Sequence, residues 1–406
     1  MTTTSVPEDA IVIPGANSGS ALACVRSLGS RGVHTIIATE DPTSTPTGSR
    51  YCQEVVTVPS PRDECLEYKR ALVSLASRPE VKTIIPTREE DIYVLSKYRD
   101  EFRRHIATPW PQFGTLQTVH DGYWLAEFVS DLGIPVPETR LFDEVVDWSR
   151  ERIIKTRYSV LTGDHVGSLT DGRLNSDLGQ IHISPQEVPD RHEILDKMKG
   201  HAPVVQEYVP IRFEYSFRAL YDHGDALATS VRRQTRGMSY AGGTSVYREL
   251  IDDATLEAFG RKILDALDWH GLATVQFIES AETGEYMFAE INPRTWTSIP
   301  CDVRAGADYP YFYWLLANDR AEQIKPSYEV GYATHLLFGE LLYLKSVLFD
   351  DYPNASRPPF HSALWSVLSS VWHHPNFDIL TADDPMPFFR GVRHYVKDNL
   401  TPGETE

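Results

Sequence analysis

Three oxygen-bearing side chains, Gln276, Glu290 and Asn292, are spaced so that one β-hairpin could bring them together. Apolar runs at 271–278 and 286–291 flank a short glycine-containing turn, which is typical of two antiparallel strands. Alternate side chains of a strand share a face, so Glu290 and Asn292 point the same way and Gln276 can lie opposite them. A carboxylate flanked by two amide oxygens is a donor set that Mg²⁺ prefers, above all beside phosphate oxygens. We therefore expect a divalent-cation site on this hairpin.

A cationic side chain, Arg294, follows these residues and is kept close to them by Pro293. Its guanidinium could hold a phosphoryl group through two parallel hydrogen bonds. The alternative is a solvated hairpin with incidental polar residues. The pattern Glu-x-Asn-Pro-Arg at the end of an apolar strand favours the site.

This hairpin resembles the metal-binding hairpin of the ATP-grasp superfamily, which includes carboxylate–amine ligases and carbamoyl-phosphate synthetase. In that family the first strand carries an acidic residue or Gln and the second carries Glu-x-Asn-Pro-Arg. Gln276, Glu290, Asn292 and Arg294 fall on those positions. The resemblance implies ATP and Mg²⁺ (or Mn²⁺) as cofactors. It also implies an α/β (α+β ATP-grasp) fold, in which a Rossmann-like N-terminal domain precedes a two-lobed ATP-grasp domain and a helical C-terminal extension.

The resemblance also implies ATP-binding residues in the smaller lobe. Lys155, near the end of a predicted strand, matches a lysine that contacts the α- and β-phosphates. The hinge that meets adenine corresponds to Gln206, Glu207, Tyr208 and Val209, where a strand breaking at a proline exposes backbone polar groups. Glu214 stands seven residues after Glu207, as a ribose-binding glutamate of the family does. Without the hairpin, each would be read as an ordinary strand or surface residue.

One residue that is common in the ATP-grasp superfamily is missing from this sequence. A helix in this family commonly begins with Asp-Lys, whose lysine contacts the phosphates, but here Asp121 is followed by Gly122. Either Lys155, an arginine from elsewhere or a second Mg²⁺ compensates, or the nucleotide chemistry is weakened. We favour compensation, because the motifs after residue 200 are intact.

Three arginines, Arg232, Arg233 and Arg236, precede a glycine-containing stretch in an otherwise acidic chain. Such a cluster indicates an anionic ligand: a triphosphate, an acylphosphate or a substrate carboxylate. The alternative is a solvated cationic strand. We expect Arg233 and Arg294 to lie nearest the chemistry.

The N-terminal residues predict strand, helix and strand over 10–38, the signature of a parallel α/β unit. Neither a complete Gly-x-Gly-x-x-Gly fingerprint nor a Gly-Lys-Ser/Thr phosphate loop occurs, which disfavours a dehydrogenase. In ATP-grasp ligases the strand ends of this domain commonly help to hold a substrate. The corresponding positions are Gly15, Asn17, Ser49, Arg50 and Glu89.

The length of 406 residues suits several domains rather than one core. We expect an N-terminal domain, a linker helix with the small lobe, a large lobe with the metal hairpin, and a helical extension, over 1–115, 116–209, 210–325 and 326–406. The extension is rich in Trp, Tyr and Leu, so its apolar faces predict core packing or a dimer interface.

The formal charge of −18 argues against a nucleic-acid partner, because phosphate backbones require a basic surface. Four cysteines without close pairing indicate neither a disulfide framework nor a zinc site. The beginning of the sequence lacks a secretory pattern, and no run of 18 apolar residues occurs, so we expect no membrane span and a cytoplasmic protein.

The resemblance implies an ATP-dependent ligase that joins a small-molecule carboxylate to an amine, with a homodimer as the expected state. One alternative is an ATP-grasp enzyme with a non-amine acceptor. The other is a nucleotide-binding regulatory protein whose catalysis has decayed.

Overall fold

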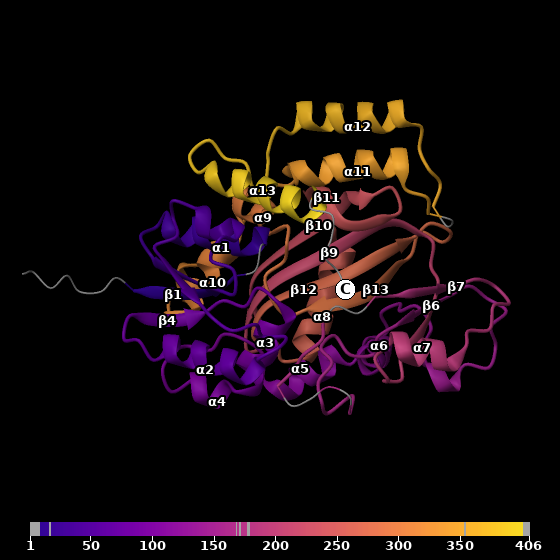
Figure 1. Ribbon diagram of the computed structural model, residues 1–406, viewed down its shortest axis with the longest axis horizontal. Coiled ribbons are helices and arrows are strands. Elements are labelled where there is room, and N and C mark those ends of the chain that lie inside the picture. The colour runs from indigo at the N-terminus through magenta and orange to yellow at the C-terminus, as the bar shows by residue number, and fades with distance from the viewer. Residues whose placement is uncertain are drawn as a thin grey trace, which may run out of the picture.

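Three β-sheets organise the chain in the computed structural model, which describes residues 9–15, 18–167, 169, 172–176, 179–352 and 355–400 (Figure 1). The side chains of 395–400 and position Asn17 lie outside that description. Two sheets are antiparallel and one is parallel. The predicted mixture of α and β structure is therefore confirmed.

The N-terminal sheet is parallel, with strand order β3-β2-β1-β4. The central strand β1 is buried along its whole length, as expected for a parallel strand covered on both faces. The strands are β1 (Ala10–Pro14), β2 (His34–Thr39), β3 (Glu54–Thr57) and β4 (Val81–Ile84). The helices of this region are α1 (Gly19–Gly29), α2 (Cys65–Ala76), α3 (Glu89–Lys97), α4 (Arg99–Phe102) and α5 (Phe113–His120), with a 3₁₀ turn η1 (Thr45–Gly48).

A second helix follows α5 after a break at Asp121, where the sequence pattern predicted one helix. This helix, α6 (Gly122–Asp131), begins there because the Asp121 carboxylate accepts hydrogen bonds from the backbone N–H groups of Tyr123 and Trp124. The chain then enters the small sheet.

The small sheet has the order β5-β8-β6-β7 and its own hydrophobic core. Ile154 and Val205, from adjacent strands, lie at the centre of that core. The strands are β5 (Thr139–Leu141), β6 (Arg152–Lys155), β7 (Ile181–Ile183) and β8 (Val204–Glu207), joined by η2 (Phe142–Glu144) and α7 (Arg191–Lys197). We call residues 139–207 the small lobe.

The large sheet has six antiparallel strands in the order β13-β12-β9-β10-β11-β14. Helix α8 (Ala254–Ala266) packs against one face of it, through Gly260 and the ring of Phe217. The strands are β9 (Ile211–Asp222), β10 (Asp225–Ser239), β11 (Gly242–Ile251), β12 (Gly271–Ser280), β13 (Tyr286–Asn292) and β14 (Ala333–His335). The last strand comes from beyond residue 325, so the sheet takes in part of the expected C-terminal extension.

Strand β11 was not predicted, because a buried arginine interrupts its apolar alternation. Arg248 lies between the buried residues Val246 and Leu250, and it is itself only 1% exposed. An ion pair with Asp378 satisfies its charge there. The alternation rule treats such a residue as exposed, and it therefore fails here.

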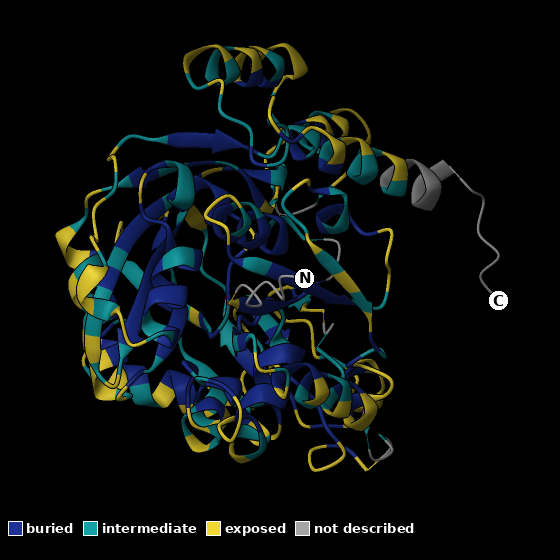
Figure 2. Ribbon diagram, turned by 90° about the vertical axis from the view of Figure 1, so that its left-hand side faces the viewer, coloured by how far each residue is buried: buried dark blue, intermediate teal, exposed yellow. Residues whose placement is uncertain are grey.

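The N-terminal sheet and the large sheet share one hydrophobic core. Ile11 and Ile13 of β1 belong to the same buried cluster as Leu220 of β9, Leu272 of β12 and Tyr309. Two further helices, α9 (Ile299–Arg304) and α10 (Tyr309–Ala317), and the turn η3 (Ala321–Gln323) complete this region. Figure 2 shows the buried interior that results.

The C-terminal extension is helical, as predicted, with α11 (Leu337–Phe349), α12 (Phe360–His373) and α13 (Met386–Leu400). Figure 1 shows α11 and α12 at one edge of the large sheet and α13 beside the N-terminal domain. Asp384 anchors this segment, accepting hydrogen bonds from the Arg26 and Ser49 side chains and from the Arg50 backbone N–H. No helix in the described part of the chain is long and apolar enough to cross a membrane.

Candidate functional site

A cleft of about 910 Å³ separates the small lobe from the large sheet. The small lobe contributes Lys155 and Gln206, and the hairpin of β12 and β13 contributes Glu290 and Asn292. The N-terminal domain reaches the same cleft through Glu89. The N-terminal domain, the small lobe and the large sheet therefore all supply polar side chains to one space.

The predicted metal ligands do come together. Gln276 lies directly opposite Glu290 in the hairpin register. The Gln276 and Asn292 side-chain amides each donate a hydrogen bond of 2.8 Å to the same atom, Glu290 Oε1. A half-turn of either amide exchanges its nitrogen for its oxygen, so the three groups can present oxygens to a cation. The donor set fits Mg²⁺ or Mn²⁺.

Lys155 lies across the cleft from this hairpin. Its Nζ donates a hydrogen bond of 2.6 Å to Gln206 Oε1, and the Gln206 amide donates in turn to Thr139 Oγ1. Burial lowers the pKa of Lys155, while the negative charge of Glu290 acts in the opposite direction. The lysine is thus held in the cleft, where it interacts with the carboxylate on the other wall.

An arginine lies beside the helix start that lacks the family's lysine. The Arg157 guanidinium donates to both carboxylate oxygens of Asp121, at 2.7 Å from Nη2 and 2.9 Å from Nε. This hydrogen bonding raises the pKa of Arg157 above its already high usual value. Arg157 lines the cleft together with Gly122. A positive charge therefore occupies the region where the sequence lacks a lysine.

Arg294, at the end of the hairpin, contacts both the metal ligands and the N-terminal domain. Its Nη2 donates to Asn292 Oδ1 at 3.1 Å, and its Nε donates to Glu89 Oε1 at 2.7 Å. His120 Nε2 lies 3.3 Å from the other oxygen of Glu89. Of the N-terminal positions singled out in the sequence, Glu89 thus lies in the cleft, whereas Ser49 and Arg50 bind Asp384 instead.

No protein-family model matches the sequence, and no curated protein matches it. Solved structures are similar. N5-carboxyaminoimidazole synthetase from Staphylococcus aureus aligns with a TM-score of 0.57 at 15% identity, over 82% of this chain and 83% of that one. An ADP complex of N5-carboxyaminoimidazole ribonucleotide synthetase gives 0.59 at 14% identity, over 92% and 99%. The biotin carboxylase domain of 2-oxoglutarate carboxylase from Hydrogenobacter thermophilus gives 0.59 at 13%, over 81% and 74%. The chain has the ATP-grasp fold.

The hinge of the ATP-grasp domain is more fully paired than the sequence suggested. The backbone N–H of Glu207 donates to Glu138 O at 2.9 Å, and that of Tyr208 donates to Glu151 O at 3.3 Å. These two N–H groups are therefore not free for adenine, contrary to expectation. Among the described residues, no partner is found for the Val209 N–H, which remains available.

Glu214 lies on β9 between two pockets. It lines a second pocket, described below, rather than the 910 Å³ cleft. Burial raises the pKa of Glu214, Arg232 opposes that shift, and Glu290 adds to it. The carboxylate is therefore close enough to the metal hairpin to interact with it electrostatically, at the edge of the cleft.

The predicted arginine cluster does not exist as one site. Successive side chains of a strand alternate, so Arg232 and Arg233 of β10 point to opposite faces. Arg233 forms an ion pair of 2.9 Å with Glu249, and its guanidinium lies over the ring of Phe213. The expectation that Arg233 lies nearest the chemistry is therefore wrong.

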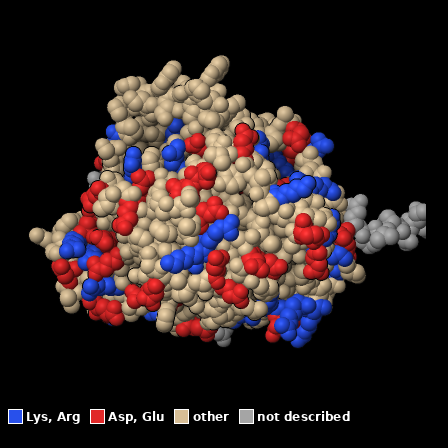
Figure 3. Space-filling view, turned by 180° about the vertical axis from the view of Figure 1, so that it is seen from behind, with Lys and Arg blue, Asp and Glu red and all other residues tan. Residues whose placement is uncertain are grey.

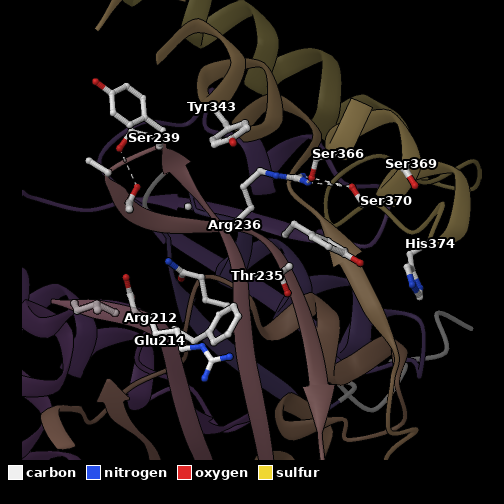
Figure 4. Close-up of a pocket in the computed structure, with 18 of the residues that line it drawn as sticks. Arg212, Glu214, Thr235, Arg236, Ser239, Tyr343, Ser366, Ser369, Ser370 and His374 are labelled. Carbon is white, nitrogen blue, oxygen red and sulfur yellow. Dashed lines mark hydrogen bonds between the residues drawn. The ribbon is translucent and has the colours of Figure 1, made fainter. Parts of the chain in front are cut away.

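Arg236 is held by the C-terminal helices. It forms an ion pair with Glu340 of α11 and donates to the hydroxyls of Ser366 and Ser370 of α12. Figure 4 shows its side chain directed toward Ser366 and Ser370, above Thr235 and Glu214, in a second pocket of about 670 Å³. The bulge between Gln234 and Arg236 is what redirects the arginine toward these helices.

Arg232 is the member of the cluster on the same face as the metal ligands, and the sequence argument passed over it. It is opposite Ser216, which is opposite Gln276 in the next strand pair. Burial, with the nearby Arg218 and Arg248, lowers the pKa of Arg232 to about 9. Alternation alone separates Arg232 from Arg233 but does not say which of them faces Gln276, because a register shift between Ala226 and Ala228 changes which residue of β10 lies opposite each residue of β9.

Proposed function

We propose that this protein is an ATP-dependent ligase that activates a carboxylate as an acylphosphate and couples it to an amine. The observation that carries the proposal is the convergence of Gln276 and Asn292 on Glu290, in a cleft lined on one side by Glu290 and Asn292 and on the other by Lys155. Similar structures support it, since several were determined with ADP. Small-molecule substrates, a cytoplasmic location and a homodimeric state belong to the same proposal.

In this proposal ATP binds between the small lobe and the hairpin. Lys155 and Arg157 face the phosphates, the Val209 N–H and the Gln206–Glu207 segment meet adenine, and Glu214 meets the ribose. A Mg²⁺ or Mn²⁺ held by the hairpin ligands would neutralise phosphate charge. Arg294, oriented by Glu89 and Asn292, keeps a further positive charge beside the transferred group.

The chemistry then proceeds in two transfers. A substrate carboxylate oxygen attacks the γ-phosphorus, the bond to the β,γ-bridging oxygen breaks, and ADP leaves. The amine nitrogen attacks the acyl carbon and loses a proton, and inorganic phosphate leaves with the acyl C–O bond broken. Phosphoryl transfer needs positioning and charge stabilisation more than covalent help, which is what a cleft lined by fixed cations provides.

Two alternative functions make different predictions. An enzyme with a non-amine acceptor would form the same acylphosphate and pass the acyl group to another nucleophile. Bicarbonate, present in the structure of the similar biotin carboxylase domain, is an acid that such an enzyme could phosphorylate. A regulatory protein without catalysis is favoured by Gly122, which stands where the family has lysine. The Arg157–Asp121 pair argues against that second reading, because it restores a cation beside the same helix start.

The deciding experiment measures ADP release with Mg²⁺ and ATP over pooled carboxylates and amines, followed by mass spectrometry of the products. We expect ADP release that requires one acid and one amine, with an amide-linked product. Release that needs an acid but no amine would indicate another acceptor. Nucleotide binding without turnover on any pool would support the regulatory reading.

A further inference from the structure

Helix α12 places small and hydroxyl side chains toward the protein and large apolar ones toward solvent, the reverse of an ordinary surface helix. Its contacts with the protein are made by small or hydroxyl side chains: Ala363 and Val367 are buried, and Ser366 and Ser370 bind Arg236. Trp365, Leu368 and Trp372 face solvent, and Leu364 is half-buried. A surface helix normally buries its large apolar side chains and exposes its polar ones.

The exposed stripe consists of Trp365, Leu368 and Trp372, which lie three and four residues apart and so share one face. Trp365 is 72% exposed and Trp372 is 84% exposed. Exposed apolar side chains of α11 and of the start of α12 accompany them. These are Leu341, Leu348, Phe349 and Phe360. We call these seven residues the α11–α12 apolar surface.

The two helices together expose a large apolar area for a solitary protein. With about 150–250 Å² for each large aromatic side chain, its seven side chains expose on the order of 700 Å². The largest apolar patch of a typical monomer is about 300–600 Å², whereas a stable dimer buries about 800 Å² on each partner. The exposed area is therefore close to what one protein–protein interface requires.

The charge distribution indicates which partner fits. The chain carries a formal charge of −18, but α12 contains no Asp, Glu, Lys or Arg. Figure 3 shows this part of the molecule without charged residues, in contrast to the mixed red and blue surface below it. Two copies of an acidic protein repel each other, so a self-contact is most favourable where neither copy has charge.

Other occupants fit less well. Helices that lie on membranes usually carry Lys or Arg on their polar face to meet anionic lipids, and α12 has neither. We infer that α12 of one copy packs against α12 of a second copy about a two-fold axis, with α11 of each copy flanking the contact.

Such a contact is isologous, so the residue nearest the axis faces itself. Leu368 is central in the stripe and is the candidate for that position. The pairing would convert two exposed helix faces into a four-helix contact with a charge-free core. Tryptophans in the centre of such contacts carry much of the binding energy.

The test compares the full-length protein with the variant Trp365→Glu/Trp372→Glu by light scattering after size exclusion, over a dilution series. We expect a wild-type dimer and a dissociation constant raised by about 100-fold or more in the variant. The matched control is Val146→Glu/Val188→Glu, which alters two exposed valines outside the surface and should leave the dimer intact. The tryptophan variant should stay folded as a monomer with the secondary structure of the wild type, because the altered side chains are exposed. Its unfolding temperature should fall only by what the loss of association removes.

A second measurement identifies the contact itself. Leu368→Cys should form an intermolecular disulfide on mild oxidation of the dimer, whereas Val188→Cys should not. A monomeric wild type, a dimer that survives the double tryptophan substitution, or wild-type flotation with phosphatidylcholine vesicles would each overturn the inference. None of these results bears on ADP release, so they are separate from tests of the proposed ligase.

Discussion

Arg294, which follows the hairpin of the large sheet, and Glu89 of the N-terminal domain are joined by an ion pair of 2.7 Å. Glu89 is the first residue of α3, so its carboxylate also lies at the positive end of that helix. Arg294 ends the metal hairpin and donates to Asn292 as well. The orientation of a cleft arginine is therefore determined by the N-terminal domain together with the hairpin.

Glu89→Gln should reduce stability at neutral pH and make it less sensitive to acid. Burial raises the pKa of Glu89, but Arg294 and His120 more than offset this, so its pKa in the folded protein lies below the usual 4.5. The folded state thus binds this proton less tightly than the unfolded chain. The ion pair stabilises the fold above about pH 4.5, and its contribution is lost as pH falls through the lower folded value.

We expect a loss of about 1–3 kcal/mol at pH 7, measured by thermal or urea unfolding without nucleotide. The difference between wild type and variant should shrink as the pH is lowered below about 4.5. A difference that stays constant across that range would show that Glu89 does not act through its charge.

Glu290→Ala should abolish Mg²⁺-dependent ADP release while the protein stays folded. The carboxylate is the common partner of Gln276 and Asn292, so its removal leaves two amides without a charged centre for a cation. We expect a fall of about 100-fold or more in turnover. Glu285→Ala, in the exposed turn of the same hairpin, is the control and should behave like wild type. Near-normal ADP release by the Glu290 variant would exclude the metal site.

Arg157→Ala should weaken ATP binding. Arg157 lines the cleft and is oriented by two hydrogen bonds that it donates to Asp121, so it can contribute charge without a large ordering cost. Loss of a charge-assisted contact should raise KM for ATP about tenfold or more. Arg191→Ala removes an exposed arginine of the same lobe that pairs with Asp143, and it should have little effect. Equal effects of the two substitutions would contradict a specific role for Arg157.

Gly260→Ala should destabilise the protein, because a methyl group at this position of α8 would overlap the ring of Phe217. We expect a loss of about 1–3 kcal/mol from the forced repacking, measured by urea unfolding. Gly114→Ala in α5 is the matched control, since nothing lies within 4 Å of the added carbon. Alanine favours a helix over glycine, so that variant should be as stable as wild type or slightly more stable. The opposite order would mean that α8 does not pack as described.

The convergence of Gln276, Glu290 and Asn292 could be predicted from the sequence because its geometry is local. Strand alternation and a short turn determine that Gln276, Glu290 and Asn292 share a face, and no distant residue is needed. The Arg157–Asp121 pair joins residues 36 positions apart, and no periodic pattern relates them.

The arginines of β10 show why the rest of the site could not be predicted. Arg236 was expected to face an anionic ligand, but Glu340, 104 residues later, takes up its charge. A contact between residues so far apart in the sequence depends on where α11 packs, which no local pattern predicts. The prediction for Arg233 failed for a different reason, since alternation along β10 already places its side chain on the opposite face from Arg232.

The division of the interior into a shared core and a separate small-lobe core determines how the cleft can open. The N-terminal and large sheets cannot part without exposing their common apolar cluster to water, whereas the small lobe keeps its own cluster intact when it swings. The segments at its two ends are fastened to β12, β13 and their turn. Pro135 O accepts the Phe288 N–H, and Pro210 O accepts the Ala281 N–H, each at 2.7 Å. Both ends of the small lobe are therefore attached to the ribbon that carries Gln276, Glu290 and Asn292. If the lobe closes over a nucleotide, we expect Lys155 to move toward Glu290 about an axis that this ribbon holds in place.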